Sequence, residues 1–99
     1  MRRTRRRRRL LEQTSTPVLK PQVRLQFDPV RNAWAVLSPE KVFWPDEISL
    51  DILQLCDGEH TVTQILEVLA LQYDAPADEM AGDVQSFLQE WSDRFLVAL

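Results

Sequence analysis

Few residues of this chain have side chains suited to covalent or acid–base chemistry. It contains one histidine, His60, one cysteine, Cys56, and two glycines, so there is no glycine-rich phosphate loop. Cys56 and His60 lie four residues apart, a spacing compatible with a Cys–His nucleophile pair. A zinc site needs three or four Cys, His or carboxylate ligands at defined spacings, and here these two residues stand nearly alone. We therefore expect no catalytic residue, no metal site and no cofactor.

Both residues also have a simpler interpretation. Cys56 continues the apolar stripe of a predicted helix, and a free cysteine is often a small buried hydrophobic residue. His60 falls in a predicted turn, where a solvated side chain is the ordinary outcome and pH sensing is the competing role. A redox or hydrolytic enzyme that uses Cys56 stays open as a rival class. It predicts that Cys56→Ala abolishes function while leaving the fold intact.

The fifteen carboxylates favour a structural interpretation over acid–base catalysis. Several sit at predicted helix starts, where negative charge is stabilising, or on predicted polar faces. These residues are Asp46, Asp78 and Glu79 at the starts, and Asp51, Glu67, Asp83 and Glu90 on the faces. No pair is isolated in an apolar setting, which is the arrangement that raises a carboxyl pKa for catalysis.

Charge divides the chain of 99 residues into two parts. Seven of its 12 basic residues are Arg2, Arg3 and Arg5 to Arg9, which leaves 5 basic and 15 acidic residues, a net charge of −10, for the rest. Like charges repel and such a run cannot form a core, so we expect residues 1–20 to be a disordered Arg-rich arm. Residues 21–99 form the predicted domain. No apolar run approaches the roughly 20 residues that span a bilayer, and we expect a cytoplasmic protein without membrane contact.

Alternating apolar residues predict three short strands at the start of this domain. Val23, Leu25 and Phe27 alternate with polar residues, which is the period of a half-buried strand. Turns at 28–32 and 38–41 separate it from strands at 33–37 and 42–44. Pro45 cannot donate to a sheet ladder, so the third strand ends there or lies at an edge.

Three helices follow the strands. Asp46 is a suitable N-cap for the first, and Asp57-Gly58 is the predicted end, with Gly58 in the left-handed region. Thr61-Val62-Thr63-Gln64 fits a capping box, so the second helix is predicted to run from Val62 to about Tyr73. Pro76 suits the first turn of the third helix. The apolar stripe of that helix consists of Met80, Val84, Phe87, Leu88, Trp91 and Phe95.

These elements predict an α+β fold in which a three-stranded antiparallel sheet precedes a three-helix bundle, similar to a winged helix. That order raises a winged-helix nucleic-acid-binding regulator as the alternative function. Residues 62–93 contain no Lys or Arg and seven acidic residues, so a recognition helix there would be repelled by phosphates. Only the Arg-rich arm is suited to binding nucleic acid, and without sequence specificity.

Two features indicate a protein partner instead. Val42-Phe43-Trp44 is an apolar segment at a predicted sheet edge, where an extended peptide can add as a strand. Trp91 lies near the end of the third helix, and tryptophan is favoured in binding hot spots. The competing interpretation places the tryptophans in the core, and we favour it for Trp34, whereas for Trp44 and Trp91 both interpretations stay open.

The motifs of the domain resemble the pyrroloquinoline quinone biosynthesis protein D (PqqD) family. The similarity extends over about residues 21–96 and rests on several elements in a fixed order. These are Val23-Arg24-Leu25-Gln26-Phe27-Asp28, Leu37-Ser38-Pro39-Glu40-Lys41-Val42, Ile52-Leu53-Gln54-Leu55-Cys56-Asp57-Gly58, Thr61-Val62 and Asp83-Val84. The chain departs from the family pattern at Lys41, at Pro45-Asp46 and at Arg94-Phe95, and the Arg-rich arm lies outside it.

The resemblance implies a peptide chaperone rather than an enzyme. It would bind a ribosomally made, PqqA-like precursor peptide and present it to a PqqE-like radical SAM enzyme that cross-links a Glu and a Tyr of the peptide. The family also implies a leader-peptide recognition groove between the third strand and the third helix. Carried onto this chain, its lining residues are Val42, Phe43, Trp44, Val84, Phe87, Leu88 and Trp91. A monomer and a homodimer are both compatible with the sequence.

Overall fold

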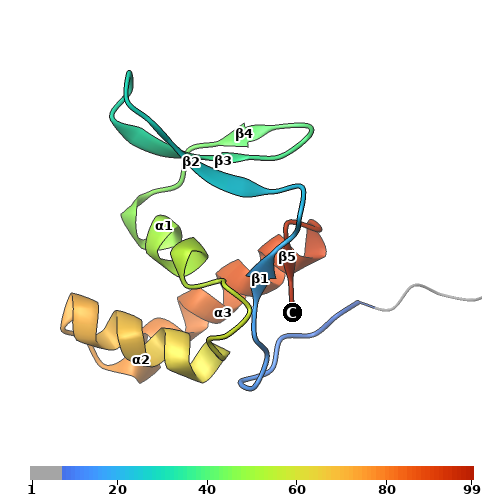
Figure 1. The fold of residues 1–99 in the computed structure, drawn as a ribbon. Helices are drawn as coiled ribbons and strands as arrows, with labels where there is room; N and C mark the ends of the chain where they lie inside the picture. The colour runs from blue at the N-terminus through green and yellow to red at the C-terminus, as the bar shows by residue number, and fades with distance from the viewer. Residues whose placement is uncertain (1–7) are drawn as a thin grey trace, which may run out of the picture.

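The alternating residues form a three-stranded antiparallel sheet in the computed structural model, which describes residues 8–99 (Figure 1). Its strands, in the order β2-β3-β4, are β2 (Arg24–Asp28), β3 (Ala33–Leu37) and β4 (Val42–Phe43). Leu25 pairs with Val36, and Val36 pairs with Phe43, so these three side chains share one face. β4 ends one residue before the predicted end at Trp44, because Pro45 has no N–H to continue a ladder.

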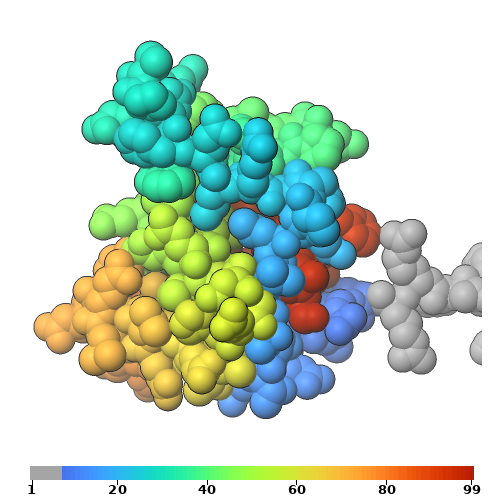
Figure 2. Space-filling model, viewed as in Figure 1, coloured from blue at the N-terminus to red at the C-terminus, as the bar shows by residue number. Residues whose placement is uncertain are grey.

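Both predicted turns form between these strands. The Asp28 carboxylate accepts a hydrogen bond from the Val30 N–H (2.9 Å), and Asn32 adopts a left-handed conformation with φ of 53°. In the second turn, the Ser38 N–H and hydroxyl both donate to the Lys41 carbonyl, at 3.0 and 2.8 Å. The β2–β3 hairpin end projects beyond the helices (Figure 2).

The first two helices begin where the sequence predicts, whereas the third begins one residue later than predicted, with Pro76 as its N-cap rather than in its first turn. α1 (Glu47–Gln54) is capped by Asp46, whose carboxylate accepts from the Ser49 N–H at 2.9 Å. α2 (Val62–Tyr73) starts with the complete capping box of Thr61 and Gln64. α3 (Ala77–Asp93) follows Pro76. The capping predictions for α1 and α2 are thus confirmed.

The predicted end of the first helix is wrong. α1 stops at Gln54 with Leu55 as its C-cap, so Asp57-Gly58 lies beyond the helix. Gly58 does have a positive φ of 80°, but its N–H donates to the Pro17 carbonyl at 2.9 Å. This glycine therefore serves a contact with the N-terminal segment, which the local pattern of the helix could not reveal.

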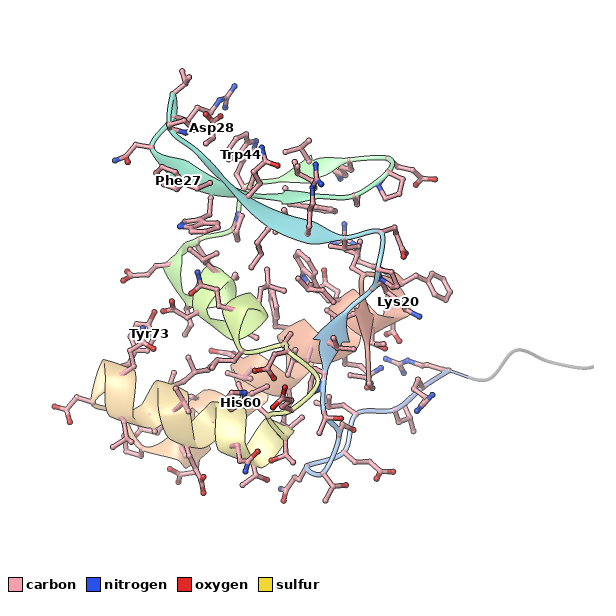
Figure 3. The ribbon with its side chains drawn as sticks, in the orientation of Figure 1. Lys20, Phe27, Asp28, Trp44, His60 and Tyr73 are labelled. Atoms are coloured by element: carbon pink, nitrogen blue, oxygen red, sulfur yellow. The ribbon has the colours of Figure 1, made fainter. Side chains whose placement is uncertain are left out.

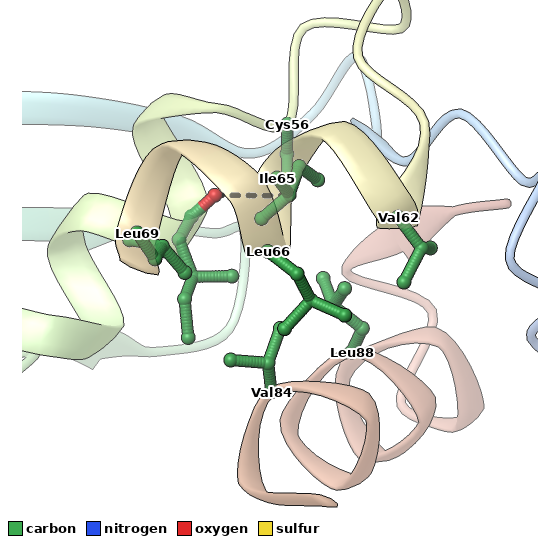
Figure 4. Close-up of a cluster of buried hydrophobic side chains, with 8 residues drawn as sticks. Cys56, Val62, Ile65, Leu66, Leu69, Val84 and Leu88 are labelled. Carbon is green, nitrogen blue, oxygen red and sulfur yellow. Dashed lines mark hydrogen bonds between the residues drawn. The ribbon is translucent and has the colours of Figure 1, made fainter. Parts of the chain in front are cut away.

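Two apolar clusters form the core. The first lies between the helices and contains Ile52, Cys56, Val62, Ile65, Leu66, Leu69, Val84 and Leu88 (Figure 4). The second lies between the sheet and α3 and contains Val23, Val36, Leu53, Trp91, Leu96 and Val97. Because α1 supplies Ile52 to one cluster and Leu53 to the other, it joins the helices to the sheet.

A second small sheet was not predicted from the sequence. β1 (Val18–Leu19) pairs antiparallel with β5 (Val97–Ala98), and Pro17 before it is buried. The domain was predicted to start at residue 21, but residues 17–20 also pack against or pair with the rest of the chain. Strands of two residues carry no detectable periodicity, so only pairing in space identifies them. The arm expected to be disordered comprises residues 1–20, and its residues 1–7 lie outside the described residues.

The observed fold is α+β, with a three-stranded antiparallel sheet and three helices, as predicted. The likeness to a winged helix stays a prediction. Over residues 8–99, the structure contains no helix with the length and apolar character needed to cross a membrane.

Candidate functional site

The edge of the sheet at β4 offers unpaired main-chain groups. Within residues 8–99, the strand order leaves one side of β4 without a neighbour in its sheet. The Ser38 N–H donates to the Lys41 carbonyl, which makes these two residues a hydrogen-bonded pair. Antiparallel pairs alternate, so Phe43 directs its main-chain groups toward β3 and Val42 directs its N–H and C=O away. The edge can therefore accept a further extended chain.

Beside this edge, three aromatic rings from β4 and α3 form a continuous cluster. The ring centroid of Trp91 lies 5.3 Å from that of Phe43 and 5.0 Å from that of Phe87. The Phe87 and Trp91 rings are stacked, at an interplanar angle of 26°. Offset and tilted ring pairs of this kind contribute beyond the area that they bury. We call the edge of β4 together with this cluster the β4–α3 surface, consisting of Val42, Phe43, Trp44, Phe87 and Trp91.

The seven residues of the expected groove differ in accessibility. Val42 and Trp44 are exposed (48% and 45%), and Phe43 and Phe87 are half-buried. Val84 and Leu88 are completely buried in the cluster against α2, and Trp91 is 6% exposed. The structure thus brings Phe43, Phe87 and Trp91 together. It places Val84 and Leu88 beneath the surface, where they hold α3 in position.

The hairpin end carries further aromatic residues. The rings of Phe27 and Trp34 meet edge to face at 5.6 Å, and the Arg31 guanidinium lies 4.7 Å from the Trp44 ring. Trp34 is 36% exposed, so the expectation that it is a core residue is wrong, because the hairpin end projects past the helices. Figure 3 shows Phe27 and Trp44 at this end of the molecule, well apart from His60. The alternation of apolar and polar residues in the sequence predicted which face of the sheet each ring occupies. It could not show how far the helices extend over that face.

Cys56 and His60, the residues considered for chemistry, both make local contacts within the fold. The Cys56 thiol is buried and donates to the Ile52 carbonyl at 3.3 Å. Burial, together with the charge of Asp57, raises the pKa of this thiol to about 12, which keeps it protonated and poorly nucleophilic near neutral pH. The His60 Nδ1 lies 2.9 Å from an Asp57 carboxylate oxygen in an exposed turn. Hydrogen bonds from the Glu59 N–H and from His60 lower the pKa of Asp57 to about 2.

Metal ligands do not converge within the described chain. Among residues 8–99, no group of three or more His, Cys, Asp or Glu side chains is arranged to hold a metal ion. The most distinctive feature of this part of the chain is therefore the β4–α3 surface.

Comparisons with known proteins give one consistent result. A family model described as coenzyme PQQ synthesis protein D (PqqD) matches residues 33–97. The PqqA binding protein of Rhodopseudomonas palustris (strain TIE-1) is 46% identical over 84 residues, which cover 85% of this chain and 82% of that protein. The PqqA binding protein of Bradyrhizobium diazoefficiens is 39% identical over the same shares of the two chains.

Two solved structures are similar in sequence and in fold. The solution structure of the PqqD truncation of Methylobacterium extorquens PqqCD has a TM-score of 0.75 and 32% identity, covering 90% of this chain and 95% of that one. It is described as a functional, stand-alone recognition element for ribosomally synthesized and post-translationally modified peptides. The crystal structure of PqqD from Xanthomonas campestris has a TM-score of 0.56 and 36% identity, covering 90% and 99% of the two chains.

Proposed function

The chain belongs to the PqqD family, and on that basis we propose that it is a peptide chaperone of pyrroloquinoline quinone biosynthesis. It binds the ribosomally made, PqqA-like precursor peptide and catalyses no reaction itself. The relatives named PqqA binding protein and the structural likeness to a peptide recognition element support this proposal. Nothing in the fold or in the comparisons favours the nucleic-acid-binding alternative.

The observation that carries the proposal is the unpaired edge of β4 beside the aromatic cluster. A peptide strand added there would exchange main-chain hydrogen bonds with the outward N–H and C=O of Val42. Every second peptide side chain would face α3 and pack on Phe43 and Phe87. Of the expected binding residues, Val84, Leu88 and Trp91 would act from beneath by fixing the position of α3. Val42 and Trp44 would contact the peptide at the opposite face of the strand.

The partner enzyme follows from the same proposal. The chaperone presents the bound peptide, in the cytoplasm, to a PqqE-like radical SAM enzyme that joins a Glu to a Tyr of the peptide. Holding the peptide on a carrier that also contacts the enzyme raises its effective concentration at the active site. A pull-down of the enzyme with the chaperone, with and without peptide, tests this step.

Calorimetry with a synthetic precursor peptide encoded by the same genome tests peptide binding directly. We expect saturable heat and a change in tryptophan fluorescence, while a scrambled peptide of the same composition gives neither. A series of peptides with single backbone N-methyl groups then tests strand addition. Because alternate N–H groups of a strand face its neighbour, N-methylation should weaken binding at every second position. No binding at high micromolar peptide contradicts the function, whereas binding without alternation contradicts only the strand geometry.

A further inference from the structure

Charge is segregated along the folded domain in a way that the peptide-binding proposal does not use. Between residues 42 and 93 the sequence contains twelve acidic residues and no Lys or Arg. Apart from the seven arginines between residues 2 and 9, the five remaining basic residues are Lys20, Arg24, Arg31, Lys41 and Arg94. Two of them, Lys41 and Arg94, flank the acidic region in sequence and come together in the fold.

Lys41 and Arg94 meet at the ring of Phe43. The Lys41 Nζ lies 5.3 Å from the ring centroid, and the Arg94 Cζ lies 5.1 Å from it. Contacts of a cation with an aromatic face at these distances are attractive. One residue comes from the turn before β4 and the other from the C-cap of α3, so both mark the same end of the β4–α3 surface.

The carboxylates near these cations leave them incompletely neutralised. Lys41 makes no ion pair within residues 8–99. Arg94 contacts Glu90 through a single pair of atoms at 3.3 Å, and both side chains are at least 40% exposed, so water screens this pair. Glu40 precedes Lys41 in the turn and borders, with Arg94, a shallow depression of about 270 Å³. A ligand carboxylate can replace Glu90 on Arg94 and give Lys41 a partner.

Strand geometry brings one peptide side chain beside Lys41, at the end of the surface where Arg94 also contacts the Phe43 ring. Lys41 and Phe43 are two residues apart in extended chain, so their side chains share the face toward α3. A strand beside β4 would place a side chain opposite Lys41, with Cβ atoms about 4.5–5.5 Å apart. The peptide side chain two residues away on the same face would then lie over Phe43 and Phe87.

Resting on the proposed function, we propose that the bound peptide carries an Asp or Glu beside Lys41 and Arg94. An apolar residue two positions from that carboxylate packs on Phe43 and Phe87. The aromatic cluster thus provides affinity for the apolar residue, and the two cations fix the register of the peptide on the edge. Peptides that lack this acidic–apolar spacing bind more weakly.

Calorimetry on the full chain with the synthetic precursor peptide tests this specificity. Lys41→Gln and Arg94→Gln should each raise Kd about three- to fivefold at low ionic strength, and the effect should shrink at high salt. Glu90→Gln should lower Kd, because it frees Arg94 and removes a like charge. Arg24→Gln is the matched control, since Arg24 lies on β2, at the opposite edge of the sheet from β4, and it should leave Kd unchanged.

The same measurement is repeated with peptides in which each Asp or Glu is changed to Asn or Gln. One such peptide should lose affinity for the wild type and show no further loss with Arg94→Gln, as expected for partners in one contact. If every amide peptide binds as tightly as the original, or if Arg24→Gln weakens binding as much as Arg94→Gln, the specificity is overturned. Both of these outcomes presuppose that the wild-type protein binds the unmodified precursor peptide, so they leave the proposed function intact. Absence of any binding would instead overturn the proposed function.

Discussion

The ring centroid of Phe43 on β4 lies 5.3 Å from the ring centroid of Trp91 on α3, and the two ring planes meet at 47°. This contact joins the edge strand of the sheet to the longest helix of the domain. Because Trp91 is also part of the core cluster beneath the sheet, one side chain supports both the fold and the candidate binding surface.

Replacing Trp91 should therefore mainly lower the stability of the fold, and any change in peptide binding should be secondary to that loss. We expect Trp91→Ala to lower the free energy of unfolding by about 3–5 kcal/mol, since a buried indole leaves a cavity that the surroundings fill only in part. Urea denaturation followed by circular dichroism measures the change. Trp44→Ala is the control, because Trp44 is exposed and should cost less than about 1 kcal/mol. Equal losses for the two variants would show that Trp91 is not a core residue.

Alkaline pH should destabilise the fold through Cys56. The pKa of this thiol is raised from 9.0 to about 12 by burial and by Asp57, so the folded state keeps a proton that the unfolded state loses. The contribution of this thiol to the stability of the fold is complete below pH 9.0 and is lost as the pH rises toward 12. The free energy of unfolding of the wild type should fall across this range, and less steeply for Cys56→Ala. Tyr73, whose pKa is raised to about 12 by its hydrogen bond to Asp51, accounts for part of the remaining slope.

If the free energy of unfolding falls equally steeply with pH for the wild type and for Cys56→Ala, this linkage is contradicted. A second measurement separates the core role of Cys56 from catalysis. A thiol reagent at pH 8 should react slowly with the native protein and rapidly in urea, and Cys56→Ala should retain peptide binding. Loss of function in a stable Cys56→Ala protein would favour the enzyme alternative.

The C-terminal end of α3 should be strained at Phe95. This residue has φ of 64°, and its N–H donates to the Ser92 carbonyl at 3.0 Å, while the Leu96 N–H donates to the Trp91 carbonyl at 2.9 Å. These are the two bonds of a Schellman motif, in which glycine is the preferred residue at this position. We expect Phe95→Gly to be more stable than Phe95→Ala by about 1 kcal/mol in urea denaturation. Both variants lose the ring, so an equal stability would rule out strain.

The N-terminal segment should contribute unequally to stability along its length. The Arg8 guanidinium makes two hydrogen bonds to the Asp93 carboxylate, at 2.9 and 2.7 Å, but both groups are exposed and water screens the pair. Deleting residues 1–10 should therefore change the thermal midpoint little. Deleting residues 1–20 removes Pro17 and β1, and should cost more than about 2 kcal/mol because buried apolar area is lost. If both truncated proteins unfold at the same midpoint, β1 contributes nothing to the fold.

Several features of this protein could be predicted from the sequence because they depend on neighbours along the chain. The capping box of Thr61 and Gln64 and the cap at Asp46 are local hydrogen bonds, and both form as predicted. The alternation through Leu25 and Phe27 depends only on strand geometry, and it located the sheet. The scarcity of catalytic residue types and the acidic helices follow from composition alone.

Only the tertiary structure decided the features that depend on contacts between distant segments. β1 and β5 come from opposite ends of the domain and are too short to show a pattern of their own. Periodicity placed Trp34 and Trp91 on apolar faces alike, yet one lies on a projecting hairpin and the other beneath the sheet. The convergence of Lys41 and Arg94 on Phe43 depends on how α3 crosses the sheet edge. Local propensity sets what each segment forms, but packing between segments determines which faces remain exposed.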